Sequence, residues 1–131
     1  YSPEFRWVSE GIEDERLGDF GLPGGGAASF ELDRADITLG TPLNAVVLAT
    51  SEGHGNHLAL IPEEILTRFS TWNGEESQEL IRSDVVYFET PHGGAVFSVR
   101  SITFCGSLPH NNFDNNISKL IANIFGRFLQ E

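Results

Sequence analysis

The stretch that constrains the fold most is residues 84–129, because it combines several recognisable elements in close succession. Two apolar runs at residues 85–88 and 95–104 are typical of strands, and the Gly-Gly turn within residues 90–94 joins them as a hairpin. A polar loop at residues 106–112 follows, and then a long amphipathic segment. We therefore expect a closing pair of strands near the end of the chain.

The amphipathic segment predicts a C-terminal helix. Its apolar side chains recur at the i, i+3, i+4 and i+7 spacing of one helical face. Asn112 or Asp114 is suited to cap its start. A helix with such a stripe has to bury it, so we expect it to lie on the sheet. The stripe is formed by Ile117, Leu120, Ile121, Ile124, Phe125 and Phe128.

Two segments upstream favour an α/β fold. Residues 44–49 form a short, continuous apolar run typical of a strand that is buried on both faces, as in a parallel sheet. Residues 62–69 begin with Pro62 and two glutamates, which is typical of a helix start. Trp72 is interpreted as an anchor for the polar insertion that follows. These features predict a three-layer α/β domain: a mostly parallel sheet with a C-terminal strand pair and a covering C-terminal helix.

The N-terminal stretch, residues 1–29, is interpreted as a linker or irregular lead-in to a domain formed by residues 30–131. Residues 9–17 favour a short helix capped by Ser9. The glycines and the proline after it break any regular period. The glycine run at residues 24–26 lacks the Gly-Lys-Ser/Thr of a phosphate-binding loop, so it favours a flexible connection or a close backbone approach.

Residues 30–34, with the sequence FELDR, alternate apolar and polar side chains as an extended segment does. Glu31 and Asp33 would then share one face, and Arg34 would point to the other. Two carboxylates brought close together suit acid–base chemistry. The alternative is a solvent-exposed face with no catalytic role.

The polar loop after residues 44–49 contains Glu52, His54 and His57 among glycines. Open α/β sheets place ligands at the carboxyl ends of their strands, so this loop is a candidate for contact with a substrate. A metal site built from the three side chains is one alternative. Helical zinc motifs, however, place two His four residues apart, and the glycines oppose a helix. A plain surface loop is the other alternative.

The charge balance limits the kinds of partner. With 19 acidic against 8 basic side chains, the net charge of −11 argues against a nucleic acid, because binding phosphates requires a Lys and Arg surface. No apolar run approaches the ~20 residues of a membrane span, so no membrane partner is expected. The single Cys105 favours a reducing, cytoplasmic location. Because the chain begins at Tyr1 and has no Met, we expect a fragment of a longer polypeptide.

A cysteine or serine hydrolase is a further hypothesis: Cys105 could act with His54, His57 or His110, and Ser107 could act with His110. A nucleophile elbow requires small residues on both sides of the nucleophile and a helix directly after it. Phe104 precedes Cys105, and the predicted helix starts several residues later. Free cysteines are often buried, so Cys105 is interpreted as structural.

The stretch GGAVFSVRSITFCGSLPHNNFDNNISKLIANIFGRF closely resembles the C-terminal part of the large (β) subunit in the N,N-dimethylformamidase family. The stretches GGGAASFELDRAD and VVLATSEGH are also similar to that family, so the resemblance covers residues 20–129. More distantly, the end of the chain looks like flavodoxin-like or class I glutamine-amidotransferase-like α/β domains. The resemblance thus implies that residues 30–131 are the C-terminal portion of such a domain. One departure is Arg100, which stands where the family has a small residue.

The resemblance implies hydrolysis of small N-substituted formamides at an iron held by two tyrosines and a glutamate upstream of the matched residues. No metal ligand is therefore assigned within this chain. The expected partners are the missing N-terminal part of the same polypeptide, a small subunit and a small amide substrate, in an oligomer. Glu31 resembles a glutamate near that iron and is expected to transfer a proton, with His54 beside it; Glu52, His110 and Asn111 are expected to line the substrate. The alternative is a non-catalytic scaffold or interaction domain of the same family.

Overall fold

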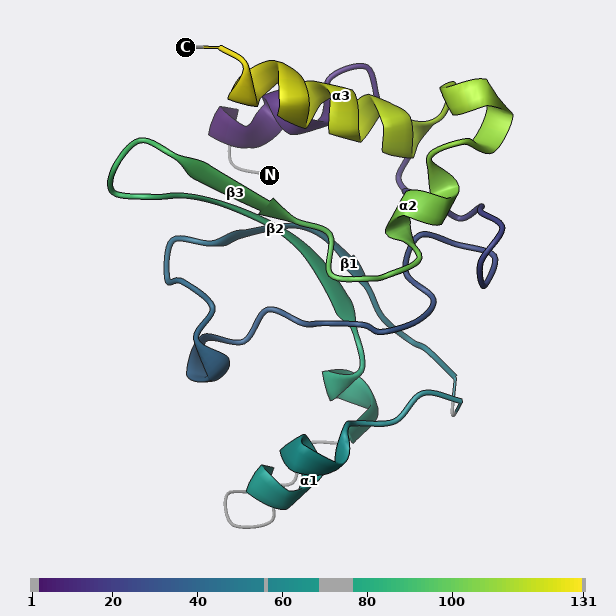
Figure 1. Cartoon of the computed structure of the whole chain (residues 1–131), viewed down its shortest axis with the longest axis vertical. Coiled ribbons are helices and arrows are strands. Elements are labelled where there is room, and N and C mark those ends of the chain that lie inside the picture. Colours follow the sequence, from purple (N-terminus) through teal and green to yellow (C-terminus); the bar gives the residue numbers. More distant parts are fainter. Residues whose placement is uncertain (1–2, 56, 69–76, 131) are drawn as a thin grey trace.

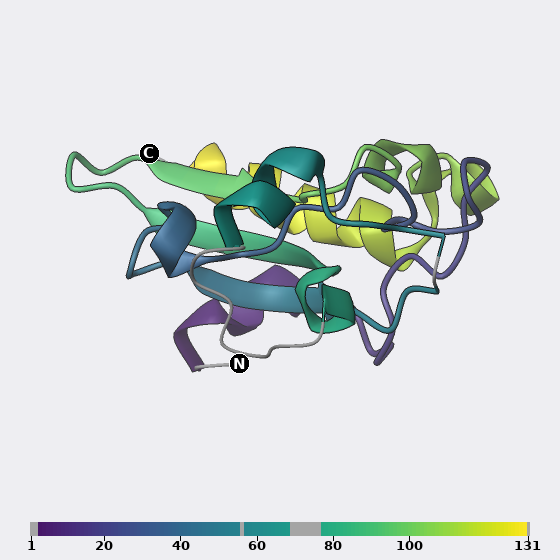
Figure 2. The same cartoon turned by 90° about the horizontal axis from the view of Figure 1, so that it is seen from below.

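The computed structural model describes residues 3–55, 57–68 and 77–130. Figure 1 shows α3 and the N-terminal 3-10 helix η1 side by side over one face of the sheet, with α1 on the other side. Figure 2, seen from below, shows α1 in front of the sheet and α3 behind it. With η denoting a 3-10 helix, the elements are η1 (Pro3–Ser9), η2 (Ile37–Leu39), β1 (Val46–Ser51), α1 (Pro62–Arg68), η3 (Ser77–Leu80), β2 (Ser83–Glu89), β3 (Ala95–Ser98), α2 (Phe104–Ser107), η4 (His110–Phe113) and α3 (Asn116–Phe128).

The sheet is antiparallel in the described residues, with the strand order β1-β2-β3. The prediction of a three-layer α/β domain with a mostly parallel sheet, flavodoxin-like or glutamine-amidotransferase-like, is therefore wrong. The apolar run in β1 predicts a strand covered on both faces, yet Val47 is 45% exposed while Leu48 is buried. A short apolar run indicates a strand, but it carries no information on the direction in which strands pair.

The hairpin formed by β2 and β3 confirms the predicted strand pair, although the second strand is shorter than expected. Its turn is closed by Thr90, whose N–H donates to the carbonyl of Gly94 at 2.6 Å. The strand predicted over residues 95–104 is wrong beyond β3. The backbone turns at Arg100, where φ is +52°, and α2 begins four residues later.

The C-terminal helix is confirmed as α3, but its cap is Asn115 instead of Asn112 or Asp114. The Asn115 side chain accepts a hydrogen bond from the Ser118 N–H at 2.9 Å. The stripe is buried over the first part of α3, whereas Phe125 is 59% exposed. The core between α3, η1 and the sheet consists of Val8, Ala27, Leu48, Tyr87, Phe104, Ile117, Leu120 and Ile124.

The N-terminal segment is packed against this core. Val8 is fully buried, and the Asn123 side chain of α3 donates hydrogen bonds to the carbonyls of Val8 and Glu10, both at 2.9 Å. The prediction of a helix that starts at Ser9 is wrong, because the helix found here, η1, ends at that residue. A domain boundary at residue 29 stays a prediction.

On the other side of the sheet, α1 confirms the predicted helix start at Pro62. Its Ile65 is 38% exposed, so this side chain is only partly covered. The proposed anchor Trp72 lies outside the described residues. Among the helices that the structure describes, none is long and apolar enough to cross a membrane.

Candidate functional site

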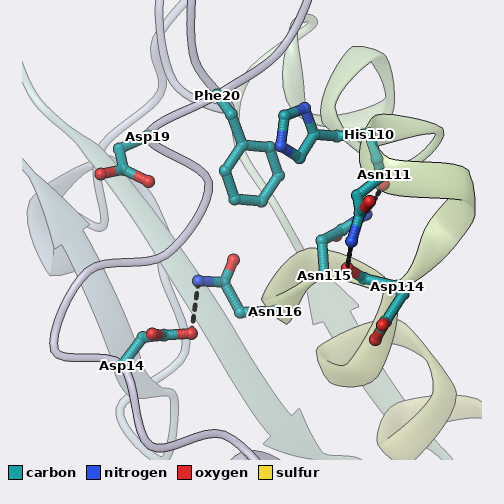
Figure 3. Close-up of a pocket in the computed structure, with 8 residues that line it drawn as sticks. All are labelled: Asp14, Asp19, Phe20, His110, Asn111, Asp114, Asn115 and Asn116. Atoms are coloured by element: carbon teal, nitrogen blue, oxygen red, sulfur yellow. Dashed lines mark hydrogen bonds between the residues drawn. The ribbon is translucent and has the colours of Figure 1, made fainter.

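Two hollows lie beside the start of α3. The smaller one, of about 390 Å³, is formed where the N-terminal loop meets the loop before α3, and we call it the acidic cleft (Figure 3). The larger one, of about 960 Å³, extends along the end of β1 toward the hydrophobic core, and we call it the core groove. The acidic cleft is lined by Asp14, Asp19, Phe20, His110, Asn111, Asp114, Asn115 and Asn116.

An aromatic stack joins the two walls of the acidic cleft. The rings of Phe20 and His110 are stacked, with centroids 4.2 Å apart and planes inclined by 17° (Figure 3). The Asn115 side chain holds the His110 loop in place, because its Nδ2 donates to the carbonyls of Leu108 at 2.9 Å and His110 at 2.7 Å. The imidazole is therefore kept at the mouth of a cleft that also contains carboxylates.

The backbone beside His110 is unusual. Asn111, Asn112 and Phe113 follow one another in the left-handed region, with φ of 51°, 54° and 66°. Asparagine adopts this conformation more readily than other residues with a side chain, whereas for phenylalanine it is strained. Strained backbone is concentrated at functional sites, so this loop favours the acidic cleft as a candidate site.

The core groove differs in chemistry. Its floor includes the core side chains Leu48, Phe104, Ile117 and Leu120, whereas its rim carries exposed carboxylates, among them Glu52. The groove therefore combines an apolar floor with an acidic edge.

The residues predicted to act together are not gathered in one place. His110 and Asn111 lie in the acidic cleft, and Glu52 lies on the rim of the core groove. His54 lines neither; its Nε2 lies 3.1 Å from Ser51 Oγ and 3.2 Å from the Ser51 carbonyl. Glu31 is exposed and also lines neither hollow. The structure thus brings only His110 and Asn111 together, and the catalytic and substrate-lining roles stay predictions.

The FELDR segment departs from the extended form that its alternation predicts. Glu31 has φ of +49°, so the expectation that Glu31 and Asp33 share one face of a regular strand is wrong. The segment is held by its neighbours instead: the Asp33 N–H donates to the carbonyl of Arg100 at 3.0 Å, and Ser101 Oγ donates to the carbonyl of Phe30 at 2.8 Å. Two loops are thereby fastened together, and Glu31 lies on the outside.

Arg34 forms a charge network that the sequence pattern does not indicate. Its guanidinium donates to the carboxylates of Glu64, on α1, and Asp36. The hydrogen bond to Glu64 is the main reason why the pKa of Arg34 is raised, against the opposing effect of burial. Burial alone would raise the pKa of Asp36, but hydrogen bonds from Thr38 and Arg34 outweigh it, so the pKa is lowered. This network fastens α1 to the loop after FELDR.

Asp84 is a second group that sequence reasoning missed. It is a buried carboxylate at the start of β2 that accepts hydrogen bonds from the Ala35 N–H at 2.7 Å, Thr50 Oγ1 at 2.9 Å and Arg82 Nε at 3.0 Å. A charged residue directly before an apolar strand run was the available signal. Its partners identify it as a structural junction between β1, β2 and the Ala35 loop. For Asp14, Asp19 and Phe20, no local pattern indicates that they line the same cleft as His110.

The nucleophile hypothesis gains no support from the described geometry. Cys105 is exposed, so the expectation of burial is wrong, and its structural role stays a prediction. Ser107 is fully buried, and its hydroxyl donates to the carbonyl of Phe20 at 2.6 Å. Ser107 therefore fixes the loop that carries Phe20, and His110 stacks on that same ring.

The described residues do not supply an iron centre held by two tyrosines and a glutamate, because Tyr87 is the only tyrosine among them. Over residues 3–55, 57–68 and 77–130, no three His, Cys, Asp or Glu side chains are grouped so that they could hold a metal ion. Tyr87 is packed edge-on against Phe5 and Trp7, and burial, followed by the charge of Glu89, raises its pKa. A raised pKa opposes the phenolate form that metal ligation requires.

Comparison with known proteins gives a consistent result. Residues 1–116 match the family described as N,N-dimethylformamidase beta subunit-like, C-terminal. The N,N-dimethylformamidase beta subunit of Paracoccus aminophilus is 44% identical over 126 residues, and that of an Alcaligenes species is 43% identical over 126 residues. Each alignment covers 95% of this chain but 16% of the relative. The predicted resemblance is confirmed: the chain belongs to the N,N-dimethylformamidase beta subunit-like family, in which it corresponds to the C-terminal region.

Proposed function

We propose that this chain is the C-terminal part of an amide hydrolase that acts on small N-substituted formamides. The observation that carries the proposal is the 44% identity to a dimethylformamidase beta subunit over 95% of the chain. Because the chain spans only 16% of that relative, the activity would belong to a longer polypeptide, with or without a small subunit, and residues 1–131 alone would be inactive. Iron, if the protein uses it, would be held by residues outside the described part of this chain.

Glu31 is the residue of this chain that we propose to transfer a proton in the reaction. Its carboxylate is exposed, so residues of the longer polypeptide can approach it. Its backbone has a left-handed conformation and lies between two hydrogen bonds, one from Ser101 to Phe30 and one from Asp33 to Arg100. These bonds restrict where the Glu31 side chain can point. A carboxylate carried by a backbone restrained in this way is suited to general acid–base catalysis. His54, in the loop that follows β1, is the second residue of this chain that we propose to take part in catalysis.

A non-catalytic structural domain of the same family is the second candidate. It is favoured by the separation of the predicted site residues, since Glu31 and His54 line neither of the two hollows. In that case the chain would contribute packing to the longer protein and no reacting group.

The test is turnover of N,N-dimethylformamide by the longer protein carrying Glu31→Gln. Loss of general acid–base catalysis typically costs ~100-fold or more in rate, and the iron content should stay the same. Glu13→Gln, at an exposed position on the N-terminal segment, is the matched control and should leave turnover unchanged. Unchanged turnover in Glu31→Gln would exclude the proton-transfer role. Hydrolysis by residues 1–131 alone would contradict the proposal that the site is completed by other sequence.

A further inference from the structure

The core groove exposes the interior of the domain at the edge of the described sheet. Five of its lining residues belong to the hydrophobic core: Ala27, Leu48, Phe104, Ile117 and Leu120. Further apolar side chains on its walls pack against that core and are only half-buried: Ile12, Leu17, Val85 and Val99. Apolar side chains left partly open beside a core gain free energy when another apolar surface covers them.

The hydroxyl groups around the groove are already used within the chain. Thr50 Oγ1 donates to Asp84 at 2.9 Å, and Ser83 Oγ donates to the carbonyl of Arg100 at 2.8 Å. Ser9 Oγ donates to the carbonyl of Arg6 at 3.3 Å, and Ser51 Oγ lies 3.1 Å from His54 Nε2. A site for a small polar molecule instead presents a few converging polar groups to its ligand.

The size of the groove also disfavours a small amide. Its volume of about 960 Å³ is at the upper end of the ~300–1,000 Å³ typical of pockets for drug-sized ligands. A formamide with a few heavy atoms would leave most of it empty. A stretch of polypeptide with several apolar side chains would fill it.

The rim of the core groove is acidic and therefore favours a positively charged partner. Glu15, Asp19 and Glu52 are exposed carboxylates at the edge of the groove, and Arg16 is the basic residue among the lining side chains. This excess agrees with the net charge of −11 for the whole chain. Complementary charges at the rim of an interface fix the register of the partner and speed its docking.

The length of the relatives supplies a source for such a segment, since this chain covers only 16% of them. We infer that the core groove is the surface on which an apolar segment of the longer polypeptide docks, with Lys or Arg side chains of that segment facing Glu15, Asp19 and Glu52. The segment completes the hydrophobic layer beside β1. The inference does not depend on amide hydrolysis, because a protein without activity would need the same packing.

Photo-crosslinking in the longer protein tests this docking. A p-benzoylphenylalanine in place of Glu52 lies on the rim of the groove, whereas one in place of Leu129 is a control at the exposed end of α3. Peptide mapping after irradiation should link position 52, and not position 129, to an apolar segment flanked by Lys or Arg in the rest of the same polypeptide. Crosslinks from position 52 only to residues 1–131, only to a second copy, or to nothing would overturn the inference.

Charge reversal gives a second readout. The double variant Glu15→Lys/Glu52→Lys should lower the Tm of the longer protein by at least about 2 °C, since it places like charges at the interface. The matched control, Glu10→Lys/Glu13→Lys, changes exposed residues that do not line the groove and should leave the Tm within about 1 °C of wild type. Equal shifts in both variants would argue against a specific partner at the rim. Amidase activity is measured on the longer protein with Glu52 in place. If that protein is inactive but the crosslink forms, the docking stands and the proposed function fails; if it is active but no crosslink forms, the proposed function stands and the docking fails.

Discussion

The side chain of Asn116, the first residue of α3, binds Asp14 across 102 positions of the sequence, with Nδ2 donating to Oδ2 at 2.9 Å. The same Nδ2 donates to the carbonyl of Arg16 at 3.0 Å, and Oδ1 accepts from the N–H of Gly18 at 3.1 Å. One buried amide thus fastens the N-terminal loop to the start of the last helix. Both hollows described above border on this contact.

Replacing this amide should weaken the fold. Asn116→Ala removes three hydrogen bonds and leaves the buried N–H of Gly18 without its acceptor, so we expect a loss of about 2–3 kcal/mol in the free energy of unfolding. Urea unfolding measures it. Lys119→Ala, which changes an exposed residue of α3 paired only loosely with Asp114 at 3.9 Å, should cost under about 0.5 kcal/mol. Similar costs for the two variants would contradict this role of Asn116.

Gly18 allows a close approach that no other residue permits. Its φ is +61°, and a Cβ would lie 2.5 Å from the Cβ of Ala27 and 2.8 Å from Cδ1 of Ile117. Gly18→Ala should therefore cost about 3 kcal/mol or more, the sum of backbone strain and overpacking. Gly25→Ala is the control, because its φ is +77° but no atom lies within 4 Å, so only the strain of about 1–2 kcal/mol remains. Thermal unfolding of both variants should rank them in this order.

Asp36 should make stability depend on pH in the acid range. Its pKa is lowered in the folded state, so its stabilising effect is fully present above the unfolded value of about 3.9 and is lost as the pH falls through the folded value. Asp36→Asn keeps an acceptor for the Thr38 N–H but removes the charge beside Arg34. At pH 7 the free energy of unfolding should be higher for the wild type than for Asp36→Asn, and this difference should shrink below about pH 4. A difference that stays constant from pH 7 to pH 2 would exclude the ionised carboxylate as its source.

Replacing Phe113 with glycine should stabilise the folded protein. Its φ of +66° is unfavourable for a side chain by about 1–2 kcal/mol, and the residue is 63% exposed, so little packing is lost on removal. Phe113→Gly should therefore raise the free energy of unfolding by up to about 1 kcal/mol. Phe104→Gly, at a buried position, should lower it by about 3–5 kcal/mol and serves as the control. If turnover of the longer protein falls while the free energy of unfolding rises, the strained loop at residues 111–113 contributes to activity at the acidic cleft.

Local patterns predicted the elements whose signals lie within a few residues. The stripe from Ile117 to Ile124 predicts α3, and the apolar run with its Gly-Gly turn predicts the β2–β3 hairpin, because periodicity and turn chemistry act within one element. The extended form predicted from the alternation in FELDR is wrong at Glu31. Hydrogen bonds from Ser101 and to Arg100 hold that segment in a bent form. Contacts across some seventy positions outweigh a local preference there.

The sequence by itself determined the family, the acidic surface, the C-terminal helix and the hairpin before it. Only the tertiary structure decided that β1 joins β2 antiparallel, that Phe20 stacks on His110, and that Glu31 lies apart from both hollows. The physical reason is the distance along the sequence over which each interaction acts. Amphipathic spacing is written into neighbouring residues, whereas strand direction and the meeting of distant loops depend on which surfaces bury each other when the whole chain folds.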